Sequence, residues 1–242
     1  MQEAAGLVSP SSSSTSTSSS PSSLRLTFLE SNSWLWEIPL PPPSLPPSLP
    51  PPSLTLLVDP VMHDLTFGAP ALIRGKKKVL NGPAVMESLA PRVDHLLISQ
   101  GFDDHCQPAS MAMAARLLPP SARIVAPRSA SKVLETFFSP ERIHYLSPGE
   151  HCYLEKRREG GRDGGRVKVT ATTGDTLGPP WQAPENGYLL EWGEKGGREE
   201  GEEPRSLYYE PHCRFKVEEF EPDTRQAAIP SSFVSTSAIT KP

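Results

Sequence analysis

A short strand that leads directly into a polar loop most constrains how this chain can fold. The apolar run at residues 95–98, His-Leu-Leu-Ile, predicts a buried strand. It continues into Ser-Gln-Gly-Phe-Asp-Asp-His at residues 99–105, and residues 108–118 then carry the proline, alanine, methionine and leucine of a helix. The pair Asp104-His105 therefore lies at the carboxyl end of a strand, where layered α/β proteins commonly bind ligands.

The rest of the chain predicts a layered arrangement of strands and helices. Apolar–polar alternation and short apolar runs predict strands at residues 24–30, 33–38, 54–59, 93–98, 123–126, 142–146, 151–154, 167–172, 188–192 and 207–210. Helix signals mark residues 83–89, 108–118 and 129–138. The order is a β-meander, then alternating strands and helices, then more strands, so the expected fold class is α+β.

Composition divides the chain into three parts. Residues 1–23 are rich in serine and poor in apolar residues, so we expect them to be disordered. Residues 24–222 form the expected domain, and residues 223–242 lose all periodicity and are expected to be an unstructured tail. The serine-rich, acid-poor start is similar to organelle transit peptides and suggests a chloroplast protein, with the cytoplasm as the alternative.

A proline-rich run at residues 39–53 interrupts the expected meander. Proline lacks an amide donor, so we expect this run to leave the sheet as an extended polyproline II insertion. It contains P-x-x-P matches that an SH3-like partner could bind, and a solvated loop is the alternative interpretation.

Charge, hydropathy and cysteine content argue against several classes of protein. The net charge of −4 gives no general attraction to nucleic acids, and no apolar run reaches the roughly 18 residues of a membrane span. The three cysteines, Cys106, Cys152 and Cys213, form no Cys-x-x-Cys pair, so we expect free thiols rather than a disulfide framework or a zinc knuckle. Cys106 adjoins His105 and is the one thiol that could touch a metal there.

The loop at residues 99–105 resembles the His-x-His-x-Asp-His signature of the metallo-β-lactamase superfamily. Asp104 and His105 match the last two positions, whereas Gln100 and Phe102 stand where the first two histidines would be. The resemblance covers residues 24–215 and is greatest to a plant and cyanobacterial group of uncertain substrate. It implies a four-layer αββα sandwich, which we expect to be incomplete at the C-terminus.

The same resemblance implies a set of metal ligands from distant segments. Asp175 takes the histidine position of a Gly-His-Thr turn, Glu210 ends a later strand in the place of a bridging acid, and His212 follows it. With Asp104 and His105, these residues imply at most one site for zinc or another divalent cation, or none. Gln100 and Phe102 would line its pocket.

Two functions are compatible with this reduced signature. The first is metal-dependent hydrolysis of an ester, lactone or phosphoester, with Asp104 and His105 as the catalytic pair acting on an unidentified small molecule. The second is a catalytically inactive member that serves as a binding or scaffold protein. In the alternative without metal, Asp104 caps the following helix and His105 packs on the loop.

Overall fold

The computed structural model describes residues 23–40, 52–67, 73–157, 163–175, 185–193, 205–212 and 233–234 of the 242-residue chain. Its strands are β1 (Arg25–Phe28), β2 (Trp34–Pro39), β3 (Ser53–Val58), β4 (Leu65–Phe67), β5 (Ile73–Gly75), β6 (His95–Leu97), β7 (Arg123–Ala126), β8 (Ile143–Tyr145), β9 (His151–Arg157), β10 (Asp163–Thr173), β11 (Asn186–Trp192), β12 (Arg205–Tyr209) and β13 (Phe233–Val234). The helices are α1 (Gly82–Leu89), α2 (Pro108–Leu117) and α3 (Ser131–Phe137), with short 3-10 turns η1 (Ala90–Arg92), η2 (Arg128–Ala130) and η3 (Pro140–Arg142).

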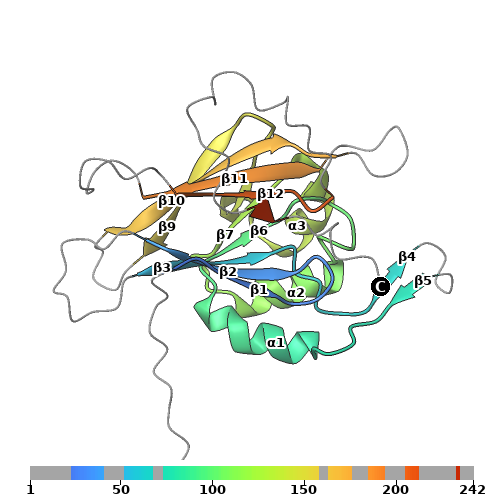
Figure 1. Cartoon of the computed structure of the whole chain (residues 1–242). Coiled ribbons are helices and arrows are strands. Elements are labelled where there is room, and N and C mark those ends of the chain that lie inside the picture. Colours follow the sequence, from blue (N-terminus) through green and yellow to red (C-terminus); the bar gives the residue numbers. More distant parts are fainter. Residues whose placement is uncertain are drawn as a thin grey trace, which may run out of the picture.

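Two sheets dominate the molecule (Figure 1). The six-stranded sheet has the order β1-β2-β3-β6-β7-β8, with antiparallel pairing from β1 to β3 and parallel pairing from β3 to β8. The five-stranded sheet has the order β13-β12-β11-β10-β9 and is antiparallel except for the β12–β13 pair. Strands β4 and β5 form a separate hairpin. The fold is therefore mixed α/β with few helices, which agrees with the expected layering of strands and helices, although the expected class was α+β.

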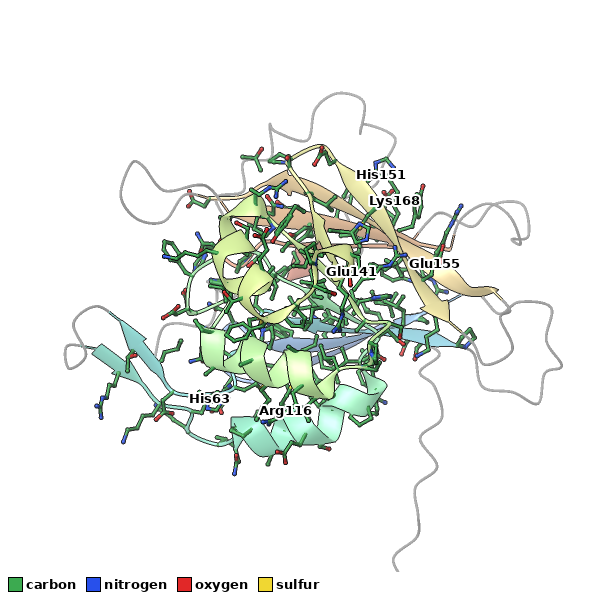
Figure 2. All side chains as sticks on the ribbon, turned by 180° about the vertical axis from the view of Figure 1, so that it is seen from behind. His63, Arg116, Glu141, His151, Glu155 and Lys168 are labelled. Carbon is green, nitrogen blue, oxygen red and sulfur yellow. The ribbon has the colours of Figure 1, made fainter. Side chains whose placement is uncertain are left out.

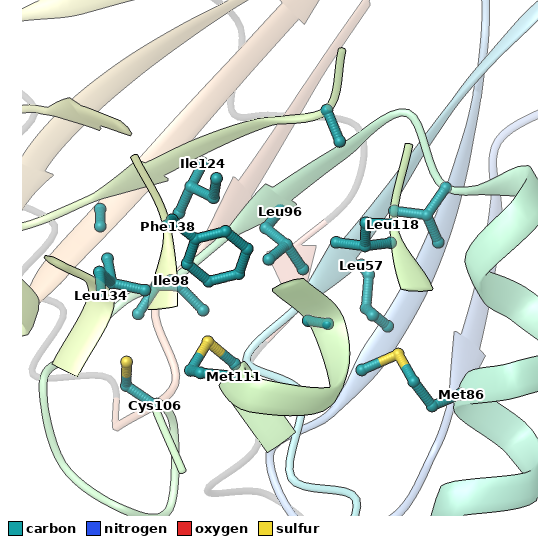
Figure 3. Close-up of a cluster of buried hydrophobic side chains, with 14 of the residues drawn as sticks. Leu57, Met86, Leu96, Ile98, Cys106, Met111, Leu118, Ile124, Leu134 and Phe138 are labelled. Carbon is teal, nitrogen blue, oxygen red and sulfur yellow. The ribbon is translucent and has the colours of Figure 1, made fainter. Parts of the chain in front are cut away.

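The three helices cover one face of the six-stranded sheet. Side chains on that face, such as Leu96 and Ile124, pack with Met86 of α1, Met111 of α2 and Leu134 of α3 in one buried cluster (Figure 3). Each of these five side chains is fully buried. Burying side chains of this size removes most of their apolar surface from water, which holds the helices against the sheet.

The opposite face of the six-stranded sheet packs on the five-stranded sheet. Leu56, Leu97 and Val125 alternate with the residues that face the helices, and they join Val169 and Leu190 of the second sheet in another buried cluster. Because successive strand residues point to opposite faces, strands buried on both sides supply both clusters. The described residues thus form three layers, helices on a sheet on a sheet, and include no second helical layer.

Several details differ from the sequence-based expectations. The β4–β5 hairpin lies in a stretch expected to be loop, since each strand has only three residues and too short a pattern to detect. Of the proline-rich run, Pro39 and Ser53 pair within the sheet, because the carbonyl of a proline still accepts hydrogen bonds; residues 41–51 lie outside the described residues.

Both ends of the chain lie largely outside the described residues. The serine-rich segment is described only at Ser23, so its expected disorder stays a prediction. The expected unstructured tail contains β13, which pairs in parallel with β12 and so occupies an otherwise open sheet edge. Among the described residues, no helix is both long and apolar enough to cross a bilayer.

Candidate metal site

The candidate site forms where two parallel strands end side by side. Strand β3 runs parallel to β6, so Asp59, which follows β3, meets Ser99, which follows β6. The Ser99 amide donates to Asp59 Oδ1 at 2.7 Å, and the Ser99 hydroxyl donates to Asp59 Oδ2 at 2.6 Å. Asp59 has a left-handed backbone, with φ of 42°, a strained conformation for a residue other than glycine.

Asp59 in turn holds the imidazole of His105. Asp59 Oδ2 lies 3.0 Å from His105 Nδ1 and also accepts the Tyr209 hydroxyl at 2.8 Å. The side chains of Asp59 and His105 are both fully buried. A buried carboxylate on Nδ1 fixes the orientation of the ring and directs its other nitrogen, Nε2, away from Asp59.

Nε2 of His105 lies near two polar groups that favour opposite protonation states of this nitrogen. A carboxylate favours a hydrogen on Nε2, and an amide donor favours a free lone pair. Asp104 Oδ2 lies 3.5 Å away, whereas the amide nitrogen of Asn32, a donor, lies 3.1 Å away. Burial alone would lower the pKa of His105, but the charges and hydrogen bonds of Asp59 and Asp104 outweigh burial and raise that pKa to about 10. The same negative surroundings would favour a metal cation on Nε2 only in place of this proton, because the two compete for one lone pair.

A second imidazole is anchored in the same manner. His212 Nδ1 lies 2.7 Å from Oε2 of Glu185, whose side chain is fully buried. Burial raises the pKa of Glu185, and the neighbouring His212 opposes that rise. The other carboxylate oxygen of Glu185 is buried with no hydrogen-bond partner among the described residues. The rings of His105 and His212 meet edge to face, with centroids 5.0 Å apart.

Asp104, His105 and His212 form a group that could hold a metal ion. One ligand atom from each lies within 4.8 Å of the other two, and no other such group occurs among the described residues. Bonds of 2.0–2.2 Å in a tetrahedral site separate ligand atoms by about 3.3–3.6 Å, so the 3.5 Å between Asp104 and His105 already fits. Two imidazoles and one carboxylate form a common ligand set for catalytic zinc with an open position.

The other predicted ligands do not join this group. Glu210 is buried and accepts a hydrogen bond from the Tyr208 hydroxyl at 3.0 Å. The backbone carbonyl of Asp175 accepts from the Glu185 amide at 3.1 Å, which places Asp175 beside the segment that carries Glu185. Of the five predicted ligands, Asp104, His105 and His212 lie within reach of one another, whereas Asp175 and Glu210 are not part of this group.

The predicted pocket residues have contrasting surroundings. Gln100 is only 2% exposed, and its amide nitrogen has no hydrogen-bond partner among the described residues, whereas Phe102 is 42% exposed. Cys106 packs in the core beneath the helices (Figure 3), and burial raises its pKa to about 12. The thiol is not part of the metal group.

The helix-capping alternative for Asp104 is wrong. Helix α2 has Gln107 as its N-cap, and no side chain makes the capping hydrogen bond. The Gln107 side chain instead accepts from the His63 amide and the Ser110 hydroxyl, and Asp104 faces His105.

Three other histidines, His63, His95 and His151, lie outside this group. His63 lies by the helical layer, and His151 lies at an edge of the five-stranded sheet, on opposite sides of the molecule (Figure 2). His95 uses both ring nitrogens elsewhere: Nδ1 accepts the Arg123 amide at 3.2 Å, and Nε2 lies 3.1 Å from the Glu155 carbonyl. The candidate group among the described residues therefore contains two histidines, His105 and His212.

Two contributors, Glu185 and Asn32, were missed by sequence reasoning. Glu185 directly precedes β11, and the Asn186 amide donates to the Ser99 carbonyl at 2.9 Å, which brings this strand start to the site. The only signal in the sequence was an acid at the start of a strand. Its role in the site depends on the contact between the two sheets, which the sequence does not show. Asn32 lies in a hairpin turn, where asparagine is ordinary.

Comparisons with known proteins add little to this geometry. No protein-family model matches the chain, and no curated protein matches it. A solved structure, an isothiocyanate hydrolase from Delia radicum gut bacteria, aligns with 64% of this chain at 16% identity and a TM-score of 0.38. The chain spans about half of that protein's length, 54%. At this level of similarity, neither the family nor the activity of the chain follows.

Proposed function

We propose that this chain is a metal-dependent hydrolase-like protein with the metallo-β-lactamase type of fold, built around one divalent cation. Asp104, His105 and His212 would hold the ion, with zinc as the first candidate. The observation that carries the proposal is the paired support of the imidazoles. Each Nδ1 is held by a fully buried carboxylate, Asp59 for His105 and Glu185 for His212. Such carboxylate–histidine pairs are the usual outer support of metal-ligating histidines.

The chemistry follows from the donor set and its surroundings. A bound divalent cation would polarise a substrate oxygen and lower the pKa of water. The protein's own contribution is to fix the ligands: Asp59 and Ser99 orient His105, and Glu185 orients His212. Three protein ligands leave a position for substrate, which suits hydrolysis of an ester, lactone or phosphoester.

A hydrolysis assay tests this proposal. Metal-stripped protein is reloaded with zinc or manganese and assayed with p-nitrophenyl acetate, a simple lactone and bis-p-nitrophenyl phosphate. We expect turnover of at least one substrate that depends on added metal and is lost in His105→Ala. The matched control is His151→Ala, which removes an exposed histidine from an edge strand and should keep the activity. Turnover that persists in His105→Ala would contradict the proposal.

The second candidate is a catalytically inactive binding or scaffold protein. It is favoured by Gln100 and Phe102 at positions where the resemblance implies histidines. It is also favoured by Glu210, which accepts from the Tyr208 hydroxyl and is not one of the three grouped ligands. Stoichiometric metal without hydrolysis of any substrate in the panel would support this candidate. The possible SH3-like partner of the proline-rich run stays a separate prediction, because residues 41–51 lie outside the described residues.

A further inference from the structure

The turn between β1 and β2 is held firmly over the candidate site. Glu30 and Ser31 both have left-handed backbones, with φ of 64° and 56°. The Glu30 carboxylate accepts the backbone amides of residues 78–80 at 3.0–3.1 Å. The Lys77 ammonium donates to the Leu29 carbonyl at 2.6 Å. Strained residues persist where their surroundings fix them, so the position of the next residue, Asn32, is set by the fold.

This turn places the side-chain amide of Asn32 directly against the metal group. Asn32 Nδ2 donates to the Asp104 carbonyl at 3.1 Å, and the same nitrogen lies 3.1 Å from His105 Nε2. An amide nitrogen carries two hydrogens. One is donated to the backbone carbonyl of the ligand loop, and the amide nitrogen that carries the other lies close to the ring nitrogen that would bind the metal.

The second hydrogen has no acceptor on the imidazole. Nε2 of His105 cannot accept a hydrogen bond from Asn32 when it carries either a proton or a metal. The Asp104 carbonyl still holds the Asn32 side chain in place. A partly buried N–H without an acceptor is unfavourable by about 1–3 kcal/mol, so the arrangement favours a ligand that brings an oxygen acceptor to this position.

We propose that Asn32 is a substrate-binding residue of the site, whose side-chain N–H donates to the carbonyl, carboxylate or phosphoryl oxygen of a ligand beside Asp104, His105 and His212. This inference rests on the proposed metal site. Asn32 would add a hydrogen-bond donor that is not part of the metal-binding signature. It would favour small molecules with an exposed oxygen acceptor. A preorganised donor of this kind also stabilises negative charge that develops on such an oxygen.

The test measures ligand binding rather than turnover. Protein loaded with cobalt(II) is titrated with acetohydroxamate, and binding is followed through the cobalt visible absorption. We compare wild type with Asn32→Ala and with Asn32→Leu, which has a similar size but no donor. A lost hydrogen bond to a charged ligand should weaken acetohydroxamate binding by about ten- to hundredfold. Cobalt affinity should not fall in either variant.

The control and the contradicting outcomes separate the two proposals. Asn81→Ala is the matched control. The Asn81 side chain is outside the metal group and accepts from the Ala84 amide at the start of α1. It should bind acetohydroxamate as wild type does. Unchanged acetohydroxamate affinity in both Asn32 variants would overturn this inference and leave the metal site intact. Failure of wild type to bind cobalt would overturn the metal site and this inference together.

Discussion

Asp59 shows how one buried residue can organise a whole site. Its carboxylate receives hydrogen bonds from the Ser99 amide, the Ser99 hydroxyl and the Tyr209 hydroxyl, and it lies 3.0 Å from His105 Nδ1. These partners come from the segment just after β6, from β12 and from the ligand loop. A fully buried carboxylate with this many donors is well satisfied, so it can support positive charge on the ring or a cation beyond it.

At the same scale, Glu185→Gln should lower the affinity for zinc without lowering the stability of the metal-free protein. The amide cannot support His212 as strongly as a carboxylate, so zinc affinity should fall about ten- to hundredfold. A neutral side chain is easier to bury, so the melting temperature of the metal-free protein should stay equal or rise. Competition with a chelating dye and thermal unfolding would measure the two effects.

The matched control for this change is Glu191→Gln, in strand β11, which Glu185 directly precedes. Glu191 pairs with Lys168 at 3.0 Å in a half-exposed position, so its replacement should leave zinc affinity as it is. Equal zinc affinity in Glu185→Gln and wild type would show that Glu185 does not support the site.

His95 should contribute a pH-dependent part of the stability. Its neutral ring accepts from the Arg123 amide and donates to the Glu155 carbonyl, and burial lowers its pKa. A lowered pKa in the folded state means that this stability is present above pH 6.5, the ordinary value, and is lost as the pH falls below it. Urea unfolding at pH 7.5 and pH 5.5, compared between wild type and His95→Gln, should show a steeper loss in wild type. Parallel losses in the two proteins would rule this contribution out.

At the residue scale, the sequence could predict only part of the site. Asp104 and His105 are adjacent and end a recognisable strand, so a local pattern identifies them. His212 follows a predicted strand end, but its role depends on Glu185, which is 27 positions away in the chain. Asn32 reaches the site through a turn with two left-handed residues, a conformation that the sequence of the turn does not signal.

At the scale of elements, the loop after β6 depends on close packing against the turn before α3. A Cβ added at Gly101 would lie 2.3 Å from the Ser129 carbonyl oxygen. Gly101→Ala should therefore displace the loop, destabilise the protein by about 1–3 kcal/mol, and weaken zinc binding through Asp104 and His105. Chemical unfolding and zinc titration of the variant would measure both.

Gly75→Ala provides the control, because a Cβ there would lie 3.5 Å from the Leu65 Cβ, an ordinary contact. It should change stability far less and leave zinc binding unaltered. Wild-type zinc affinity and stability in Gly101→Ala would show that the loop tolerates displacement.

The elements themselves were largely predictable because their patterns are local. Residues 56–58 and 96–98 are short apolar runs, which is typical of strands buried on both faces, and the structure places β3 and β6 there. Helix α2 begins at Pro108, as the proline predicted. The β4–β5 hairpin escaped because three residues are too few to show a period.

At the scale of the whole molecule, the site exists because two sheets stack. β3, β6 and the loop after β6 supply Asp59 and His105 from the first sheet, whereas Glu185 and His212 flank β11 and β12 of the second. Periodicity predicts that each strand has a buried face, but it does not state which strands share a sheet. The convergence of the two carboxylate–histidine pairs is therefore a property of the three-dimensional packing alone.

The most direct test of the metal site is the zinc content of the purified chain after removal and reloading of metal. Wild type should retain about one zinc ion per chain and gain thermal stability, because a ligand that binds only the folded state stabilises it. His105→Ala and His212→Ala should each lose the zinc and the gain in stability. A wild-type chain that retains no zinc, or variants that retain it as wild type does, would contradict the account.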